Sequence, residues 1–237
     1  MPSLNALPLL SAFGASLLLT VAAILPIANP PAMAPTFLSL TGGADHRMRA
    51  AIAARVGRST TLMLLAAMLI GSYVLDFFGL SLPVVRVAGG LTVAAYGWRM
   101  LSTSAPITPA RSHLAERFTA EAGRASAFYP LTFPITCGPG SLAAAITVGT
   151  SLHSADLPTG LANFAGGMVG CVLIGLAVYL TYRFAQRLLA PLGEAGIIVF
   201  LRMSAFILLC LGVQIMWTGA SALLGEVLRG AMAGAGA

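Results

Sequence analysis

Six long apolar stretches, separated by shorter polar segments, dominate the pattern of hydrophobic and polar positions along the chain. They cover roughly residues 7–29, 60–79, 80–101, 128–151, 160–182 and 196–224. Each holds about the 20 apolar residues that a helix needs to cross the hydrocarbon core of a bilayer. None has the short alternating pattern of a membrane β-strand. The pattern therefore predicts an all-α membrane protein with six transmembrane helices.

The composition agrees with this prediction. Apolar residues make up 58% of the chain and charged residues only 8%, far from the balance of soluble proteins. So little polar sequence lies outside the six stretches that we expect no second, soluble domain. Residues 1–6 carry no Lys or Arg, so we expect the first stretch to be a retained span rather than a secretory signal.

Three prolines of the first stretch recur in the fourth. The pairs, each separated by 104 residues, are Pro26 and Pro130, Pro30 and Pro134, and Pro35 and Pro139. Residues 69–71 align with 173–175 at the same offset. Because each half holds three spans, an odd number, the second half enters the membrane from the opposite side. We therefore predict two inverted three-helix repeats, at 1–104 and 128–237, joined by a linker at 105–127.

The arginine positions predict the orientation in the membrane. All 13 basic residues are Arg, and most fall in the connections after the first, third and fifth stretches. By the positive-inside rule these connections face the cytoplasm, which makes 105–127 a cytoplasmic linker and places both termini outside. The net charge of +6 is then a signal of topology, and no clustered basic patch or motif indicates a nucleic-acid partner.

Each proline cluster is expected to break its helix, because proline lacks the backbone donor and clashes with the preceding turn. In the first stretch we expect the break at Asn29-Pro30-Pro31 and a new helix near Pro35, which would free the amides of residues 36–38. In the fourth stretch the sequence 138–140, Gly-Pro-Gly, is expected to free the amides of residues 141–143 in the same way.

Broken helices at corresponding positions of two inverted halves indicate the binding site of a transporter. A half-helix N-terminus offers free amides and a partial positive charge, which suit a carboxylate. The neighbouring side chains are small and uncharged, which suits a small zwitterion. The candidate substrate-binding residues are Asn29, Pro30, Thr36, Thr132, Thr136, Gly138, Pro139, Gly140 and Ser141. The alternative is that the prolines only kink closely packed helices.

These motifs resemble the MarC family of bacterial integral membrane proteins, also called the neutral amino acid transporter (NAAT) family. The resembling segments are 26–30 with 35–41, 77–83 with 86–90, 133–140, and Arg202. The resemblance implies an inverted arrangement of three and three spans within the LysE-like superfamily. It also implies location in the bacterial inner membrane and transport of small neutral amino acids such as glycine and alanine. The chain departs from the family pattern at Pro31-Ala32, Cys137 and Ser141, which leaves the substrate open.

Charged residues are few and avoid the middles of the spans. Coupling to H⁺ or Na⁺ through a buried carboxylate therefore has no evident carrier, while backbone carbonyls at the breaks remain candidates. Asp76 and Arg86 are expected to form an ion pair near the outer face, and Arg202 is expected to pair with Glu194. Alternatively, Arg86 and Arg202 reach inward, where they hold a carboxylate or close a gate.

Other function classes leave weaker signals in the chain. No nucleophile set, phosphate loop or metal-ligand spacing occurs in the sequence, so we expect neither an enzyme nor a metal or cofactor site. An exporter of another small solute or drug-like compound, a channel, and a structural membrane protein remain alternatives. A membrane thiol–electron conduit would use Cys137, but the repeat mate of that residue is Met33. Small-residue faces at Gly89-Gly90 and 166–170 are read as helix packing, and they permit a monomer or a homodimer.

Overall fold

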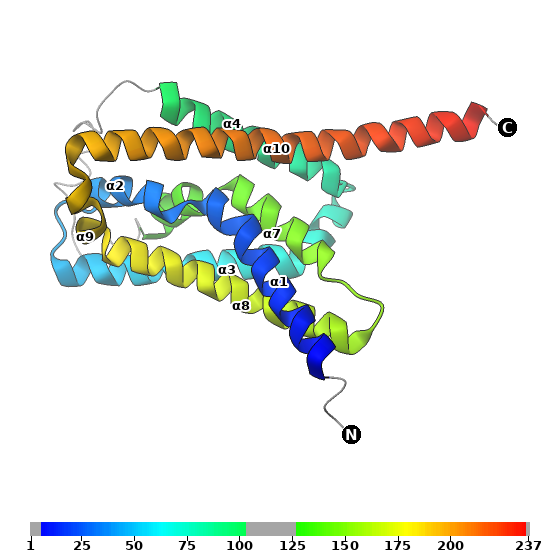
Figure 1. Ribbon diagram of the computed structural model, residues 1–237, viewed down its shortest axis with the longest axis horizontal. Coiled ribbons are helices and arrows are strands. Elements are labelled where there is room, and N and C mark those ends of the chain that lie inside the picture. Colours follow the sequence, from blue (N-terminus) through cyan, green and yellow to red (C-terminus); the bar gives the residue numbers. More distant parts are fainter. Residues whose placement is uncertain (1–5, 103–126, 236–237) are drawn as a thin grey trace.

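A computed structural model describes residues 6–102 and 127–235, where every regular element is a helix (Figure 1). The first half holds α1 (Ala6–Ala28), α2 (Pro30–Leu40), α3 (His46–Phe77) and α4 (Leu82–Ser102). The second half holds η2 (Ala127–Thr136), α7 (Pro139–Ser151), α8 (Leu157–Arg183), α9 (Ala185–Leu189), η3 (Ala190–Leu192) and α10 (Gly193–Ala235). The predicted all-α class is confirmed for this part of the chain. The linker expected at 105–127 lies almost wholly outside the described residues.

Five of the six predicted spans meet the length and apolarity that a membrane crossing requires. Four are single helices, at Leu7–Ala28, His46–Phe77, Leu157–Arg183 and Ala195–Arg229. The fifth is the pair Ala127–Thr136 and Pro139–Ser151, which is bent by 69°. The sixth, α4, has 21 residues but is not among these candidates. It carries Arg86 and Arg99, and two guanidinium groups in so short a helix lower its mean hydropathy.

Helix α3 begins well before the apolar stretch that predicted it. The side chain of Asp45 accepts a hydrogen bond of 2.7 Å from the amide of Met48, which caps the first turn. Ala and Arg, both good helix formers, fill the next turns. The segment expected as a connection between spans is therefore helical from His46 onward.

Glycines let helices of the two halves approach each other closely. A Cβ at Gly57 of α3 would lie 2.7 Å from the carbonyl oxygen of Gly175 in α8. A Cβ at Gly90 of α4 would lie 2.4 Å from the amide nitrogen of Met216 in α10. Helices α4 and α10 run side by side along one face of the bundle (Figure 1). The predicted packing role of Gly89-Gly90 is confirmed, as is that of 166–170, where Gly166 meets the backbone of Phe13.

One end of the bundle collects most of the arginines of the described chain. Antiparallel packing of α3 on α8 brings the start of α3 and the end of α8 to the same end. The arginines at this basic end are Arg47, Arg49, Arg55, Arg58, Arg99, Arg183, Arg187 and Arg202. The first residue of α1 and the last of α10 lie toward the opposite end (Figure 1).

Two identical substitutions test the close packing of α4 on α10. Gly90→Ala forces a methyl group against the backbone of α10, whereas a Cβ at Gly14 of α1 meets nothing within 4 Å. We expect Gly90→Ala to destabilise the fold by about 1–3 kcal/mol. Gly14→Ala is expected to be neutral or stabilising by up to about 1 kcal/mol. Thermal denaturation of both variants in detergent measures the difference. Equal melting temperatures would show that α4 and α10 do not pack as described.

Candidate functional site

The first helix break lies at a single residue, Asn29. Its φ of 39° and ψ of 59° are left-handed, a conformation that Asn tolerates better than most residues. Its amide donates to the carbonyl of Leu25 at 2.9 Å, and its own carbonyl accepts from the amides of Ala32 and Met33. The break is confirmed where the sequence predicted it.

The restart of the helix is not where we expected it. Helix α2 begins at Pro30, and Pro35 lies inside it. Pro30 and Pro31 occupy the first two helical positions, where the missing N–H group costs nothing. The amides of residues 36–38 therefore lie in the helix interior, and the expectation that they are free is wrong. Thr36, a candidate binding residue, is half-buried in the middle of α2.

The prolines leave carbonyl groups unpaired on the other side of this break. In a continuous helix the carbonyls of Pro26 and Ile27 would accept from residues 30 and 31. Both of these residues are prolines, so neither can donate. No other described residue donates to these two oxygens. The end of α1 thus presents two free backbone acceptors.

The second break separates η2 from α7. The η2 segment is itself kinked, with extended backbone at Tyr129 and Phe133. Thr132 donates to the carbonyl of Ala127 at 2.7 Å and Thr136 to that of Leu131 at 2.6 Å. Gly138 is extended, with φ −85° and ψ −179°, and α7 begins at Pro139. The hydroxyl groups of the two candidate threonines are thus engaged with their own helix.

The first turn of α7 presents free donors. The amide of Leu142 bonds to the carbonyl of Gly138 at 3.2 Å. Pro139 has no amide hydrogen, and no described residue accepts from the amides of Gly140 and Ser141. Of the amides predicted to be free, that of Ser141 is free, while Leu142 is bonded and Ala143 lies further inside the helix.

The two breaks meet in space. A Cβ placed on Gly140 would lie 3.5 Å from Cγ2 of Ile27, at the end of α1. The same Cβ would lie 2.0 Å from Cγ2 of Val93, so α4 covers this point as well. The end of α1 and the start of α7 therefore lie close together, with Gly140 and Ser141 buried, Ile27 half-buried and Pro26 exposed.

An aromatic stack that the sequence analysis missed lies beside this region, toward the basic end. The hydroxyl groups of Tyr182 and Thr136 share a hydrogen bond of 2.7 Å. The ring of Tyr182 stacks on that of Phe37, with centroids 4.5 Å apart and planes inclined by 14°. These contacts tie α8 and η2 of the second half to α2 of the first, and both rings are buried.

The repeat has no matching stack at the other end. At the offset of 104 residues, Phe37 corresponds to Ser141, and Tyr182 corresponds to Phe78. Ser141 carries no ring, and Phe78 is 67% exposed. Among the described residues, the buried stack on the basic side of the breaks therefore has no counterpart at the repeat-related positions. The offset itself was the signal that could have identified this difference from the sequence.

A second feature missed by the sequence analysis is Thr60 of α3. Its side chain is fully buried, and its hydroxyl oxygen has no hydrogen-bond partner within 6–102 and 127–235. One turn before and after it, Val56 and Leu64 pack in the clusters that contain Leu131 and Cys137. Thr60 therefore lies on the face of α3 that packs along η2.

The arginines proposed as gates or ion-pair partners lie outside the region of the breaks. Arg86 donates from Nε to the hydroxyl of Thr147 on α7 at 3.4 Å, and no described contact joins it to Asp76. Arg202 donates to the carbonyl of Leu101, the end of α4, at 2.5 Å. An arginine at a helix C-terminus satisfies a carbonyl that the helix leaves unpaired. The side chain of Glu194 lies outside the described residues, so the pairing expected with Arg202 stays a prediction.

Comparison with known proteins decides the family. The family model described as "MarC family integral membrane protein" matches residues 14–224. The chain belongs to the MarC family. The inner membrane protein MarC of Citrobacter koseri is 30% identical over 199 residues, which cover 83% of this chain and 90% of that protein. The proteins of the same name from Escherichia coli K12 and Shigella flexneri are 29% identical over 198 residues, with the same coverage.

Membership of the MarC family confirms the resemblance seen in the motifs and the integral membrane class. No solved structure matches the chain. The names of these relatives give a location in the inner membrane but name no substrate. The chemistry of the residues around the two helix breaks is therefore the guide to what this MarC protein binds.

The Tyr182–Thr136 bond can be tested with two tyrosine variants of the same helix. Tyr182→Phe keeps the stack on Phe37 but removes a buried hydrogen bond, so we expect a loss of about 1 kcal/mol. In Tyr179→Phe the lost partner is the exposed guanidinium of Arg183, and we expect little change. Thermal denaturation in detergent compares the two. A larger loss for Tyr179→Phe would contradict the assignment.

Proposed function

We propose that this MarC protein is a secondary transporter of small neutral amino acids, glycine- or alanine-like, with its substrate site between the two helix breaks. The observation that carries the proposal is the approach of Ile27 to Gly140, which brings the end of α1, with its unpaired carbonyls, near the free amides at the start of α7. Polar backbone groups left unpaired inside a membrane are costly unless a cavity or a ligand serves them.

The backbone chemistry matches a zwitterion. The amides of Gly140 and Ser141, at a helix N-terminus, suit a carboxylate. The carbonyls of Pro26 and Ile27 suit an ammonium group, which has only donors. No charged side chain takes part, so a substrate with a net charge would leave one of the two sets unmatched. A small side chain fits best, because Val93 and Ile27 already crowd Gly140.

The packing of the helices supports an inverted repeat that moves as two halves. The second spans, α3 and α8, pack on each other, as do the third spans, α4 and α10. The first span of each half also packs across the boundary, α1 on α8 and α7 on α3. Alternating access by rocking of such halves leaves the site fixed while opening one side at a time.

The aromatic stack supplies the closed side of this cycle. Tyr182, Thr136 and Phe37 close the basic end, which the positive-inside rule assigns to the cytoplasm. The relatives are named as inner membrane proteins, and together with this rule they support our proposal that both termini lie outside the cytoplasm. The cycle then runs between this cytoplasm-closed state and one in which the stack is broken.

Two alternatives rest on weaker observations. An exporter of another small neutral solute would use the same backbone groups, so it differs from the proposed amino acid transporter only in its substrate. A thiol–electron conduit needs thiols that a partner can reach. Cys137 and Cys171 belong to one apolar cluster and both are fully buried, which argues against that function.

Counterflow in proteoliposomes tests the proposal directly. Purified protein is loaded with unlabelled solute, and uptake of labelled glycine, alanine or serine is followed against a panel of unrelated solutes. We expect saturable exchange of the neutral amino acids, with or without proton or sodium gradients to identify the coupling ion. Exchange no faster than in empty liposomes under every gradient would reject amino acid transport.

Gly138→Ala tests the location of the site. The extended backbone of Gly138 admits any residue, and its new methyl group would lie 3.1 Å from the carbonyl of Pro134. Gly140→Leu would be a poor probe, because Val93 leaves no room for even a Cβ. We expect Gly138→Ala to fold normally. Crowding against Pro134 is expected to shift the start of α7, so that one of its free amides no longer reaches the substrate carboxylate and substrate affinity falls about tenfold. Gly14→Ala, in open space, is the matched control, and equal transport by both variants would place the site elsewhere.

A further inference from the structure

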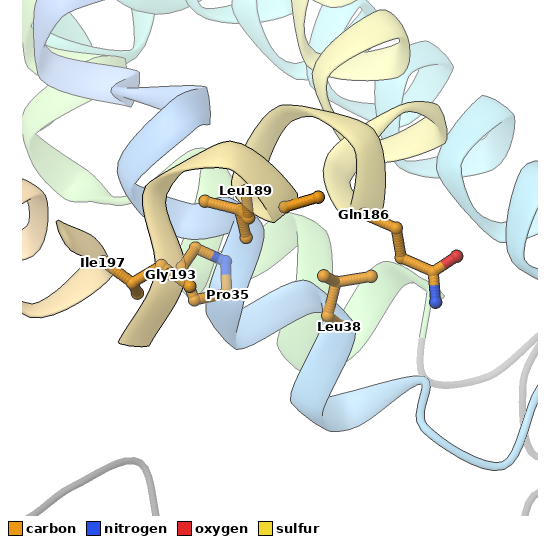
Figure 2. A pocket seen from close by; sticks show the side chains of 7 residues that line it. Pro35, Leu38, Gln186, Leu189, Gly193 and Ile197 are labelled. Carbon is orange, nitrogen blue, oxygen red and sulfur yellow. The ribbon is translucent and has the colours of Figure 1, made fainter. Parts of the chain in front are cut away.

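A cavity of about 540 Å³, largely open to its surroundings, lies outside the region of the helix breaks, at the basic end of the bundle. Figure 2 shows its walls, with Pro35 and Leu38 of α2 facing Leu189 of α9. Gly193 and Ile197 of α10 form another wall, and Gln186 lies at the edge. All the lining residues except Gln186 are apolar. A volume in this range is typical of sites for small organic molecules.

The cavity exists because the two halves differ in length. The pairs Pro35 and Pro139, and Leu38 and Leu142, correspond at the offset of 104 residues. In the first half, α3 and α4 are joined by residues 78–81 alone, and α4 packs tightly on α7. In the second half, α9 and η3 stand between α8 and α10, and α10 makes few contacts with α2. The added segment thus stands between α2 and most of α10, and Ala34, Leu189 and Ile197 pack together beside the opening that remains.

Two arginines flank the segment that forms the α9 wall of this cavity. The chain turns at Phe184, which ends α8 and precedes α9, and Arg183 is the last residue of α8. Arg187 of α9 directly follows Gln186 and precedes Ala190 by three residues, and Gln186 and Ala190 both line the cavity. Basic residues of this segment therefore neighbour the apolar opening in the chain.

The two guanidinium groups also have no acidic partner in the described part of the chain. Cζ of Arg183 lies 5.7 Å from the ring centroid of Phe184, and Cζ of Arg187 lies 6.0 Å from the same centroid. Arg183 also donates to the hydroxyl of Tyr179. Two cations held around one ring repel each other, so an anion placed between them would be stabilised.

The position along the bilayer selects the source of that anion. The span Leu157–Arg183 ends at Arg183, so the arginines lie where an apolar helix leaves the hydrocarbon core and meets the headgroups. Basic pockets between membrane helices on the cytoplasmic side are recognised sites for anionic lipid headgroups. A free anion could pair with the two arginines but would not fill the apolar cavity. A ligand with both an anionic group and an apolar chain matches both features.

We propose that the cavity between α2, α9 and α10 binds an anionic phospholipid of the surrounding membrane, with an acyl chain against Pro35, Leu38 and Ile197 and its phosphate held by Arg183 and Arg187. This site does not depend on which solute the protein transports. The segment α9 and η3 occurs only in the second half. Its proposed role is to hold a lipid at the position where helices of the first half pack directly on each other.

Lipid retention by the purified full-length protein tests the proposal. Protein in detergent is titrated with phosphatidylglycerol, and bound lipid is counted by native mass spectrometry alongside the shift in melting temperature. We expect phosphatidylglycerol to bind and stabilise the protein, while phosphatidylcholine and glycerol phosphate do neither. Equal binding of phosphatidylcholine would overturn recognition of the headgroup charge. Equal stabilisation by glycerol phosphate would identify a site for a free anion instead.

Three variants locate the lipid. The double substitution Arg183→Gln with Arg187→Gln is expected to weaken phosphatidylglycerol binding by roughly tenfold to thirtyfold. Ala190→Phe fills the cavity from an exposed position while keeping both arginines, and we expect the same loss. Arg229→Gln, an exposed arginine at the far end of α10, is the matched control and should bind as the parent does.

Parent-like binding by the double variant or by Ala190→Phe would place the lipid elsewhere. Loss in Arg229→Gln as well would indicate only a general effect of net charge. Because the readout is bound lipid, failure here would leave the transport proposal standing.

Discussion

The absence of an amide hydrogen in proline is the constraint on which this structure depends. Inside a bilayer every carbonyl that loses its helical donor needs another partner. Pro30 and Pro31 remove the donors of Pro26 and Ile27, and Pro139 removes one from the first turn of α7. The helices of the MarC bundle bury the free amides of Gly140 and Ser141, whereas at the end of α1 Ile27 is half-buried and Pro26 is exposed.

Close helix packing follows from the same need. The broken segments are short, so they are held by their neighbours rather than by their own length. Glycines at Gly57, Gly90 and Gly166 let whole backbones come into contact, which fixes α3 on α8, α4 on α10 and α1 on α8. Each of these pairs joins one half of the chain to the other. The region of the breaks is therefore enclosed by interfaces between halves, which are the surfaces that a rocking motion would use.

Much of the fold was predictable from the sequence, because apolar length and proline spacing are properties of single segments. The break at Asn29 and the bend at Gly138 follow from the local chemistry of Pro and Gly. The restart at Pro30 was not predicted, because Pro30 and Pro35 suit a first helical position equally well and only the observed backbone separates them. The early start of α3 was missed because a capped, basic helix resembles a polar connection in hydropathy alone.

The contents of the candidate site were harder to predict, for a physical reason. Thr132 and Thr136 were predicted to be ligands, but in the kinked η2 segment their hydroxyl groups bond to backbone carbonyls five residues earlier. The contacts of Tyr182 with Phe37 and Thr136 join residues that are far apart in the chain, and no local pattern announces them. The pairing of Arg202 with Leu101 likewise depends on how α10 lies along α4.

The segment formed by α9 and η3 has no counterpart in the first half, so the two halves of the chain differ in structure. In a molecule with two identical halves, the inward-open and outward-open arrangements would be mirror states of equal free energy. Here one half carries an additional turn and an aromatic closure that the other lacks. For the transporter proposed above, this difference would bias the resting equilibrium toward one arrangement. The apparent affinity for solute would then differ between the two faces of the membrane before any ion gradient acts.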